Sequence, residues 1–450
     1  VKASAGALEQ LLTPGEPYPV DIAIAAGKFK ATVEGTVAEP QTMEGLDVAL
    51  SVEGENLANL YPLVGVALPP SPPYKLTGKL GREGTRWRFA DFDGRLGGSD
   101  LRGTTAVDTG AKRLKVDADL RSNLLDFDDV GILIGGKRDE EEQAEAKAKA
   151  EGKPVDDDGK VLPDKPIDLS KLREMDANVR FRATAIRAPG LPVNDLNAEV
   201  TLNEGVLRFK PVALKLAGGD VRLYLTLDSS VQPAGVDLDA RVSPVDLKKL
   251  MSGSGFAREA AGTIGGRAKL DTRGNSVADI LGAADGNVFI VMAGGTISQL
   301  LVELAGLDIA ESLGVAFNGD KPVPVRCVVA DLSAQKGIFS VRNMIFDTVD
   351  TKIVGEGVIN LADEELDLRL TPMPKDFSPL TVRNPISIEG TLKNPQAFPD
   401  PADIGVEGIA KKVVNAILTP IVGLLPPIDE GVGEDSDCGA LIAQAQQATQ

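Results

Sequence analysis

The sequence alternates between apolar and polar residues along most of its length, and this period of two constrains the fold more than any other feature. Five runs show it most clearly: Leu46, Val48, Leu50 and Val52; Leu114, Val116, Ala118 and Leu120; Leu223, Leu225 and Leu227; Val236, Leu238, Ala240 and Val242; and Leu366, Leu368 and Leu370. Successive side chains of a strand point to opposite faces, so each run predicts a strand with one apolar face. Turn signals such as Asn203-Glu204-Gly205 separate the runs, which indicates a mainly β, antiparallel fold.

The strands also repeat along the chain. A shift of 120 residues places Arg88-Phe89 on Arg208-Phe209 without a gap. The same shift pairs Leu96 with Leu216, Gly98 with Gly218, Asp100 with Asp220 and Arg102 with Arg222. A weaker third copy opens at Gly337-Ile338-Phe339. Self-similarity of this kind predicts β-units that stack on their neighbours, with chance likeness between short hairpins as the alternative.

Composition removes several classes of function. The 450 residues include no histidine, which excludes a Ser-His-Asp triad, a histidine base and a histidine metal cluster. Lysine and arginine number 48 against 66 acidic residues, a net charge of −18 that disfavours nucleic acid as a partner. The carboxylates of Asp126, Asp128 and Asp129 are typical of a solvated turn, and Asp156-Asp157-Asp158 lacks the spacing of a calcium loop. We therefore expect no enzyme activity, no cofactor and no metal.

Three segments interrupt the alternation. Lys137 to Lys160 is dense in charge and predicts a solvated loop with a short helix from Asp139 to Ala150. Thr296 and Gln299 form a capping-box pattern ahead of a helix that ends near Gly306. Ile404 to Leu418 has helical spacing, and we expect it to cap the end of the sheet, with a membrane or partner contact as the alternative.

The apolar run at the C-terminal end does not predict a membrane span. It extends from Val413 to Ile428 and is interrupted by three prolines, whereas a spanning helix needs about 20 apolar residues. The expected organisation is β-repeats in residues 1–135, a charged insertion in 136–166, β-repeats in 167–400 with a helical insert near 296–316, and a helical cap and tail in 401–450.

The chain has two cysteines, Cys327 at the start of an expected strand and Cys438 in an acidic turn near the C-terminal end. Their spacing does not fit a metal site. A disulfide between them would close a long loop, which the loop-entropy model values at about 4–5 kcal/mol, and would require an oxidising compartment. Two free thiols in a cytosolic protein are the alternative.

Several segments together resemble the AsmA family of bacterial envelope proteins. The matching segments are Val325-Arg326-Cys327, Gly355 to Leu361, Leu366-Asp367-Leu368, Pro385 to Pro395, the Asp437-Cys438 tail and, upstream, Leu68 to Gly78 and Leu96 to Gly103. The resemblance covers most of the chain from about Pro17. It implies an inner-membrane anchor, expected to precede Val1, with a periplasmic body. It also implies a long twisted β-groove lined with aliphatic residues and a role in moving phospholipid toward the outer membrane.

The expected fold is thus a long twisted antiparallel sheet of repeated β-units that forms an open hydrophobic groove, with few short helices and a C-terminal helical cap. Alternation alone fits a closed sandwich equally well, but few helices are available to cover the apolar faces, which favours a groove. The residues expected to line it are Leu46, Val48, Leu50, Leu114, Val116, Leu120, Leu223, Leu225, Leu227, Leu366, Leu368 and Leu370.

The expected function is non-enzymatic transfer of phospholipid in the periplasm, with acyl chains held by burial at roughly 0.8 kcal/mol per methylene. Phospholipid is the expected partner, together with an envelope protein, and Cys327 and Cys438 are predicted to be bonded. A structural or assembly factor without bound lipid is the main alternative, and a carboxylate-based hydrolase is a more remote one.

Overall fold

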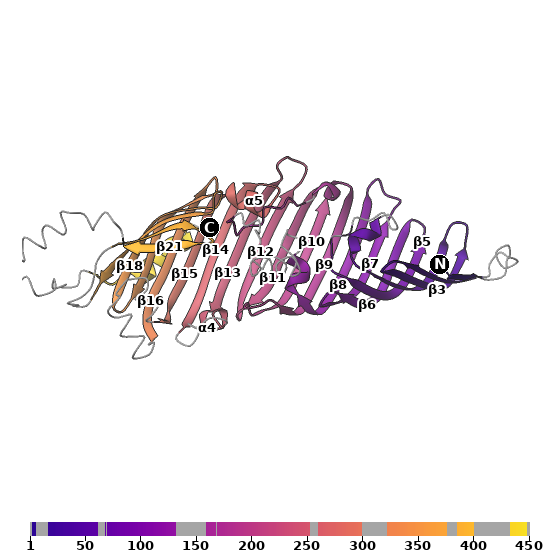
Figure 1. Ribbon diagram of the computed structural model, residues 1–450, viewed down its shortest axis with the longest axis horizontal. Helices are drawn as coiled ribbons and strands as arrows, with labels where there is room; N and C mark the ends of the chain where they lie inside the picture. The colour runs from indigo at the N-terminus through magenta and orange to yellow at the C-terminus, as the bar shows by residue number, and fades with distance from the viewer. Residues whose placement is uncertain are drawn as a thin grey trace, which may run out of the picture.

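The strands of the protein lie side by side in chain order and form one long sheet (Figure 1). The computed structural model describes residues 2–5, 17–61, 68, 70–131, 159–167, 169–252, 260–298, 322–375, 385–399 and 433–447. Within these ranges the sheet has 21 strands. Each strand pairs with the strand before it and the strand after it, so the strands make a single layer rather than a sandwich. The direction of the strands turns gradually along the sheet, as expected for the right-handed twist of β-structure.

The strands of the first half are β1 (Lys2–Ala5), β2 (Tyr18–Ala26), β3 (Phe29–Glu39), β4 (Glu44–Gly54), β5 (Tyr74–Glu83), β6 (Arg86–Leu96), β7 (Ser99–Asp108), β8 (Leu114–Asp126), β9 (Met175–Arg187) and β10 (Val193–Asn203). Those of the second half are β11 (Val206–Leu216), β12 (Gly219–Asp228), β13 (Gly235–Asp246), β14 (Ala261–Arg273), β15 (Asp285–Ser298), β16 (Pro322–Gln335), β17 (Ile338–Thr348), β18 (Thr351–Asn360), β19 (Glu365–Pro374), β20 (Ile386–Thr391) and β21 (Pro395–Pro399).

One pair of strands departs from the expected antiparallel order. β8 and β9 run parallel, with Ala118 opposite Val179, whereas the other paired strands are antiparallel. Parallel neighbours need a connection that returns along the length of the strand, and residues 127–174 provide it. The charged insertion expected from the sequence therefore coincides with the one change of direction in the described sheet.

Short helices lie at the two long edges of the sheet, as α5 and α4 show in Figure 1. They are η2 (Leu57–Leu60), α2 (Phe127–Gly131), η4 (Ser170–Arg173), α4 (Leu247–Leu250) and α5 (Val277–Gly282). Local capping explains where three of them begin, because the side chains of Asn56, Asp246 and Ser276 accept hydrogen bonds from backbone N–H groups of the first turn.

The repeat seen in the sequence corresponds to equivalent hairpins. The pairs β6–β7 and β11–β12 both have a register shift just after the shared phenylalanine, Phe89 in the first and Phe209 in the second. The third, weaker copy forms β17–β18 and has a shift after Ser340. A bulge increases local twist, so its recurrence gives each unit the same bend.

Two of the expected helices are not tested, and the start of a third is wrong. The segments 139–150 and 404–418 lie outside the described residues. Thr296, where the capping-box pattern predicted a helix start, lies near the end of β15 and is paired with Pro324. Cross-strand pairing here overrides a local capping signal. No helix in the described part of the chain is long and apolar enough to cross a membrane.

A C-terminal helix is present, as the sequence predicts, but the described one lies further along the chain than the segment 404–418 that has helical spacing. The helix α9 (Cys438–Gln447) packs Leu441 and Ile442 against Phe289, Val291 and Val329 of β15 and β16. A disulfide joins Cys438 to Cys327 of β16, the pairing expected from the sequence, with their Cα atoms 5.9 Å apart. The tail therefore lies across these two strands.

Candidate functional site: the apolar face of the sheet

One face of the sheet is apolar from β2 to β19, and we call it the inner face. Directly paired residues in neighbouring strands point to the same side, so the register can be followed from strand to strand. The row that contains Leu225 comprises Val20, Gly35, Val48, Leu80, Phe89, Thr105, Ala118, Val179, Val200, Phe209, Leu225, Leu238, Leu270, Gly286, Ala334, Phe339, Ile359 and Leu366. It crosses 18 strands, and Thr105 is its one polar residue.

Glycine occurs in this row where the neighbouring strand is too close for a side chain. Gly35 and Gly286 have φ values of +155° and +143°, and a Cβ atom on either would lie 2.3 Å and 2.1 Å from a backbone carbonyl oxygen. Glycine is therefore the residue that these two positions can hold, and the row has no side chain at either of them.

All twelve residues that the sequence analysis assigned to the groove lie on the inner face. Residues an even number of positions apart in a strand point to the same face. The assigned residues of β4, β8 and β12 are spaced in this way from Val48, Ala118 and Leu225, and those of β19 are so spaced from Leu366. Leu46, Val48 and Leu227 are buried by neighbouring protein, and the other nine are half-buried. The half-buried residues are the ones that a bound apolar ligand could reach; their contact with lipid stays a prediction.

The short helices cover the inner face only at its long edges. Leu60 of η2 packs with Leu76 and Phe92, and Leu247 of α4 packs with Met292 and Ile264. Between the edges no second sheet lies over the described strands. The arrangement is therefore a trough with partly closed edges.

Residues 159–167 and 169–173 form a strap along one edge of this trough. At one end Glu364, 2% exposed, accepts hydrogen bonds from the backbone N–H groups of Val161 (2.6 Å) and Leu162 (3.2 Å). Further along, Leu169 packs on Leu227, which explains why Leu227 is buried. The strap links the turn after β18 to the start of β9, nine strands away in the sheet.

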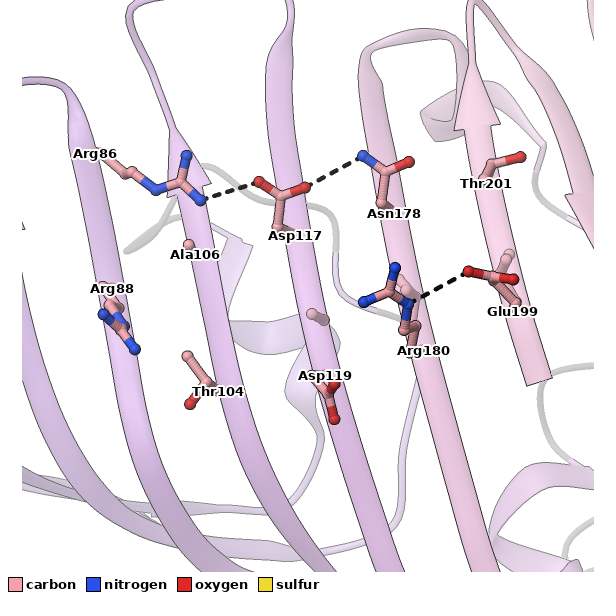
Figure 2. A pocket seen from close by; sticks show the side chains of 13 residues that line it. Arg86, Arg88, Thr104, Ala106, Asp117, Asp119, Asn178, Arg180, Glu199 and Thr201 are labelled. Carbon is pink, nitrogen blue, oxygen red and sulfur yellow. Dashed lines mark hydrogen bonds and ion pairs between the residues drawn. The ribbon is translucent and has the colours of Figure 1, made fainter. Parts of the chain in front are cut away.

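The opposite, outer face is mostly polar, except at β15 and β16, where α9 covers its apolar residues Phe289, Val291 and Val329. A hollow of about 490 Å³ lies over β6 to β10 and is lined mostly by charged and polar side chains (Figure 2). Arg86 pairs with Asp117 at 3.1 Å, Asn178 donates to Asp117 at 3.2 Å, and Arg180 pairs with Glu199 at 3.3 Å. Charged walls of this kind do not suit an acyl chain, so a lipid tail has one favourable face.

Acidic groups on the outer face experience opposite environments. Hydrogen bonds from Arg267 and Arg241 hold the pKa of Asp239 well below its usual range. Burial and the neighbouring carboxyl of Asp271, directly opposite in the next strand, raise the pKa of Asp237. Asp239 is thus a stabilised anion, and Asp237 is destabilised in its ionised form.

Two of the acidic residues that the sequence places in a solvated turn, Asp126 and Asp129, have protein partners. The carboxylate of Asp126 pairs with Arg187 at 2.7 Å, and Asp129 accepts hydrogen bonds from the backbone N–H (2.9 Å) and the hydroxyl (2.5 Å) of Ser99. The contacts to Ser99 secure the turn between β6 and β7, and the pair with Arg187 joins the ends of β8 and β9. Asp156-Asp157-Asp158 lies outside the described residues.

Metal binding has one geometric candidate among the described residues. Potential ligand atoms of Cys327, Asp347 and Cys438 lie within 4.8 Å of one another. Both sulfur atoms belong to the disulfide, so they are not thiolate ligands, and the carboxylate of Asp347 is paired with Lys375 at 2.5 Å. The group anchors the tail.

The fold and its faces define a single-layer, one-sided amphipathic β-trough. The model of the AsmA family matches residues 4–344, and the chain belongs to this family. It is 32% identical to the AsmA family protein YhjG of Escherichia coli K12, over 98% of this chain and 66% of that protein. It is 24% identical to the protein AsmA of the same organism, over 44% of this chain and 32% of that protein.

The chain therefore spans just under two thirds of the first of these relatives and about a third of the second. No solved structure matches the chain.

Proposed function

We propose that the protein carries phospholipid acyl chains along its inner face within the bacterial envelope. One observation supports this most directly: the register joins one residue from each of 18 consecutive strands in a row that is apolar except for Thr105, and the described strands leave that face open between its edges. Membership of the AsmA family agrees with an envelope role.

The physical reasoning needs no catalytic group. An acyl chain on an aliphatic floor gains roughly 0.8 kcal/mol for each methylene removed from water. Because the floor is similar from strand to strand, that gain changes little as the chain moves along it. The head group stays in water at the open side, so the lipid is held without a fixed position.

Native mass spectrometry of the purified protein tests the proposal. We expect co-purifying phospholipid in the wild type, and loss of it in Leu225→Asp and Leu368→Asp, which put a carboxylate into the trough. Matched controls lie on the outer face of neighbouring strands. Ala213→Asp places the same charge opposite Arg222, and Ser387→Asp places it opposite Arg369.

The melting transition separates this proposal from the alternative of a lipid-free assembly factor. If Leu225 and Leu368 touch lipid, the two inner-face variants lose lipid and keep most of their stability. If both variants unfold while the controls do not, these residues form a closed protein core, and the proposal loses its main support.

A further inference from the structure

A row of arginines crosses the outer face, and we propose that it is the docking surface for an acidic segment of a partner protein. The register places eight residues of β7 to β14 in one line: Arg102, Arg121, Arg182, Asn197, Ala213, Arg222, Arg241 and Arg267. We call this line the arginine row. At a strand spacing of about 4.8 Å it is roughly 35 Å long. This inference is independent of lipid binding on the inner face.

The arginine row places like charges next to one another in a protein that is acidic overall. Arginines that lie directly opposite one another repel, and the whole protein carries a net charge of −18. Asp93, Asp119 and Asp239 are the acidic residues that pair with the row, at distances between 2.6 and 3.6 Å. Asp100 and Asp220 lie near Arg102 and Arg222 and interact with them electrostatically. Asp220 is paired with Lys215 at 2.7 Å, and Asp100 accepts hydrogen bonds from the backbone N–H groups of Asn123 and Leu124. The six arginines therefore still outnumber the three aspartates that form ion pairs with the row.

The row consists of two triplets that belong to the internal repeat. The shift of 120 residues that relates the two β-units places Arg102 on Arg222 and Arg121 on Arg241. In each unit a third arginine, Arg182 or Arg267, completes the line on the next strand. Outward-facing arginines have thus been retained in both units, although many other exposed positions differ between them.

Pairing within the sheet does not explain this retention. Arg102 lies opposite Asp93 and pairs with it at 2.6 Å. The repeat equivalent of Asp93 is Ala213, which lies opposite Arg222. Arg222 has therefore lost its cross-strand partner and is still an arginine. Within the described ranges neither Arg222 nor Arg182 makes an ion pair, and both are exposed.

The chemistry of the row fits a narrow anionic chain. Guanidinium groups bind carboxylates in bidentate fashion. Neighbouring positions of the row are about 4.8 Å apart, which is close to the 5.4 Å rise of one helical turn. A helix with one glutamate per turn would match the row over about 23 residues. A flat anionic membrane fits less well, because it would also approach the outer-face carboxylates of Asp237, Asp271 and Asp285.

Binding of a synthetic peptide tests the proposal. The probe is a helical peptide of about 23 residues with one glutamate per turn, and its counterpart has glutamine in those places. We expect the glutamate peptide alone to bind the intact protein at low ionic strength, with affinity that falls as salt is added. The double variant Arg182→Gln/Arg222→Gln should weaken binding by about tenfold or more.

The control double variant Arg95→Gln/Lys336→Gln removes two exposed charges outside the row and should change affinity by less than about twofold. Melting curves establish that both variants are folded. Three results would overturn the proposal: no binding of the glutamate peptide to the wild type, equal losses in the two double variants, or row-dependent binding to phosphatidylglycerol vesicles without binding to the peptide.

Discussion

The ammonium group of Lys375 lies 2.5 Å from a carboxylate oxygen of Asp347, which is fully buried where the C-terminal tail meets the sheet. Asp347 also accepts a hydrogen bond from the backbone N–H of Ser436 at 2.9 Å, and Lys375 pairs with Asp435 at 2.7 Å. The two residues thus connect β17 and the end of β19 to the tail.

Removing the ammonium group from this pair should destabilise the protein. Lys375→Met leaves the buried carboxylate of Asp347 with the more distant Arg326, and we expect a loss of about 3 kcal/mol in the free energy of unfolding. Lys336→Met, at an exposed turn, is the control and should be nearly neutral. Chemical denaturation measures both, and equal unfolding midpoints for the two variants would show that the pair contributes nothing.

The disulfide should stabilise the protein by restricting the unfolded chain. Cys327 and Cys438 are 111 residues apart, so the loop-entropy model gives about 4–5 kcal/mol. Denaturation with and without a reductant measures this difference. Thiol labelling of denatured, non-reduced protein from an oxidising compartment should find no free thiol, and two labelled cysteines per chain would contradict the pairing.

Two aspartates of β13 should respond to pH in opposite ways. The pKa of Asp239 is lowered in the folded state, so its stabilising effect is present above the unfolded pKa of about 4 and is lost as the pH falls below it. Asp239→Asn should therefore cost about 1–2 kcal/mol at neutral pH and much less in acid. Urea unfolding at both pH values measures the difference.

The pKa of Asp237 is raised in the folded state, so the ionised carboxyl opposes folding once the pH is above that value. Asp237→Asn should stabilise the protein at neutral pH and have little effect in acid. If Asp237→Asn and Asp239→Asn both destabilise the protein at neutral pH, the environments assigned to the two carboxyls are wrong.

The strands and their apolar face could be predicted because alternation is a local signal. Leu223, Leu225 and Leu227 show their common face without knowledge of any neighbour. The register that aligns them with Leu366, seven strands away, depends on bulges and turns and had to come from the structure. The same holds for the arginine row, because Arg182 and Arg222 are adjacent to no other arginine in the sequence.

Long-range packing explains what sequence reasoning missed. The strap at Val161 and Leu162 is fixed by Glu364, some 200 residues away, which no local pattern reveals. The helix α9 begins at Cys438, and its position depends on the disulfide and on the apolar surface of Phe289 and Val329. Thr296 shows the converse, a good local helix signal that a neighbouring strand overrides.

Photo-crosslinking tests the central claim most directly. A photoreactive amino acid is placed, one site at a time, at Leu225 or Leu366 on the inner face and at Ala213 or Ser387 on the outer face, in cells whose phospholipid is radiolabelled. Lipid transport along the inner face predicts labelled protein from Leu225 and Leu366 and background levels from the other two sites. Equal labelling of the two faces, or none from Leu225 and Leu366 in folded protein, would contradict it.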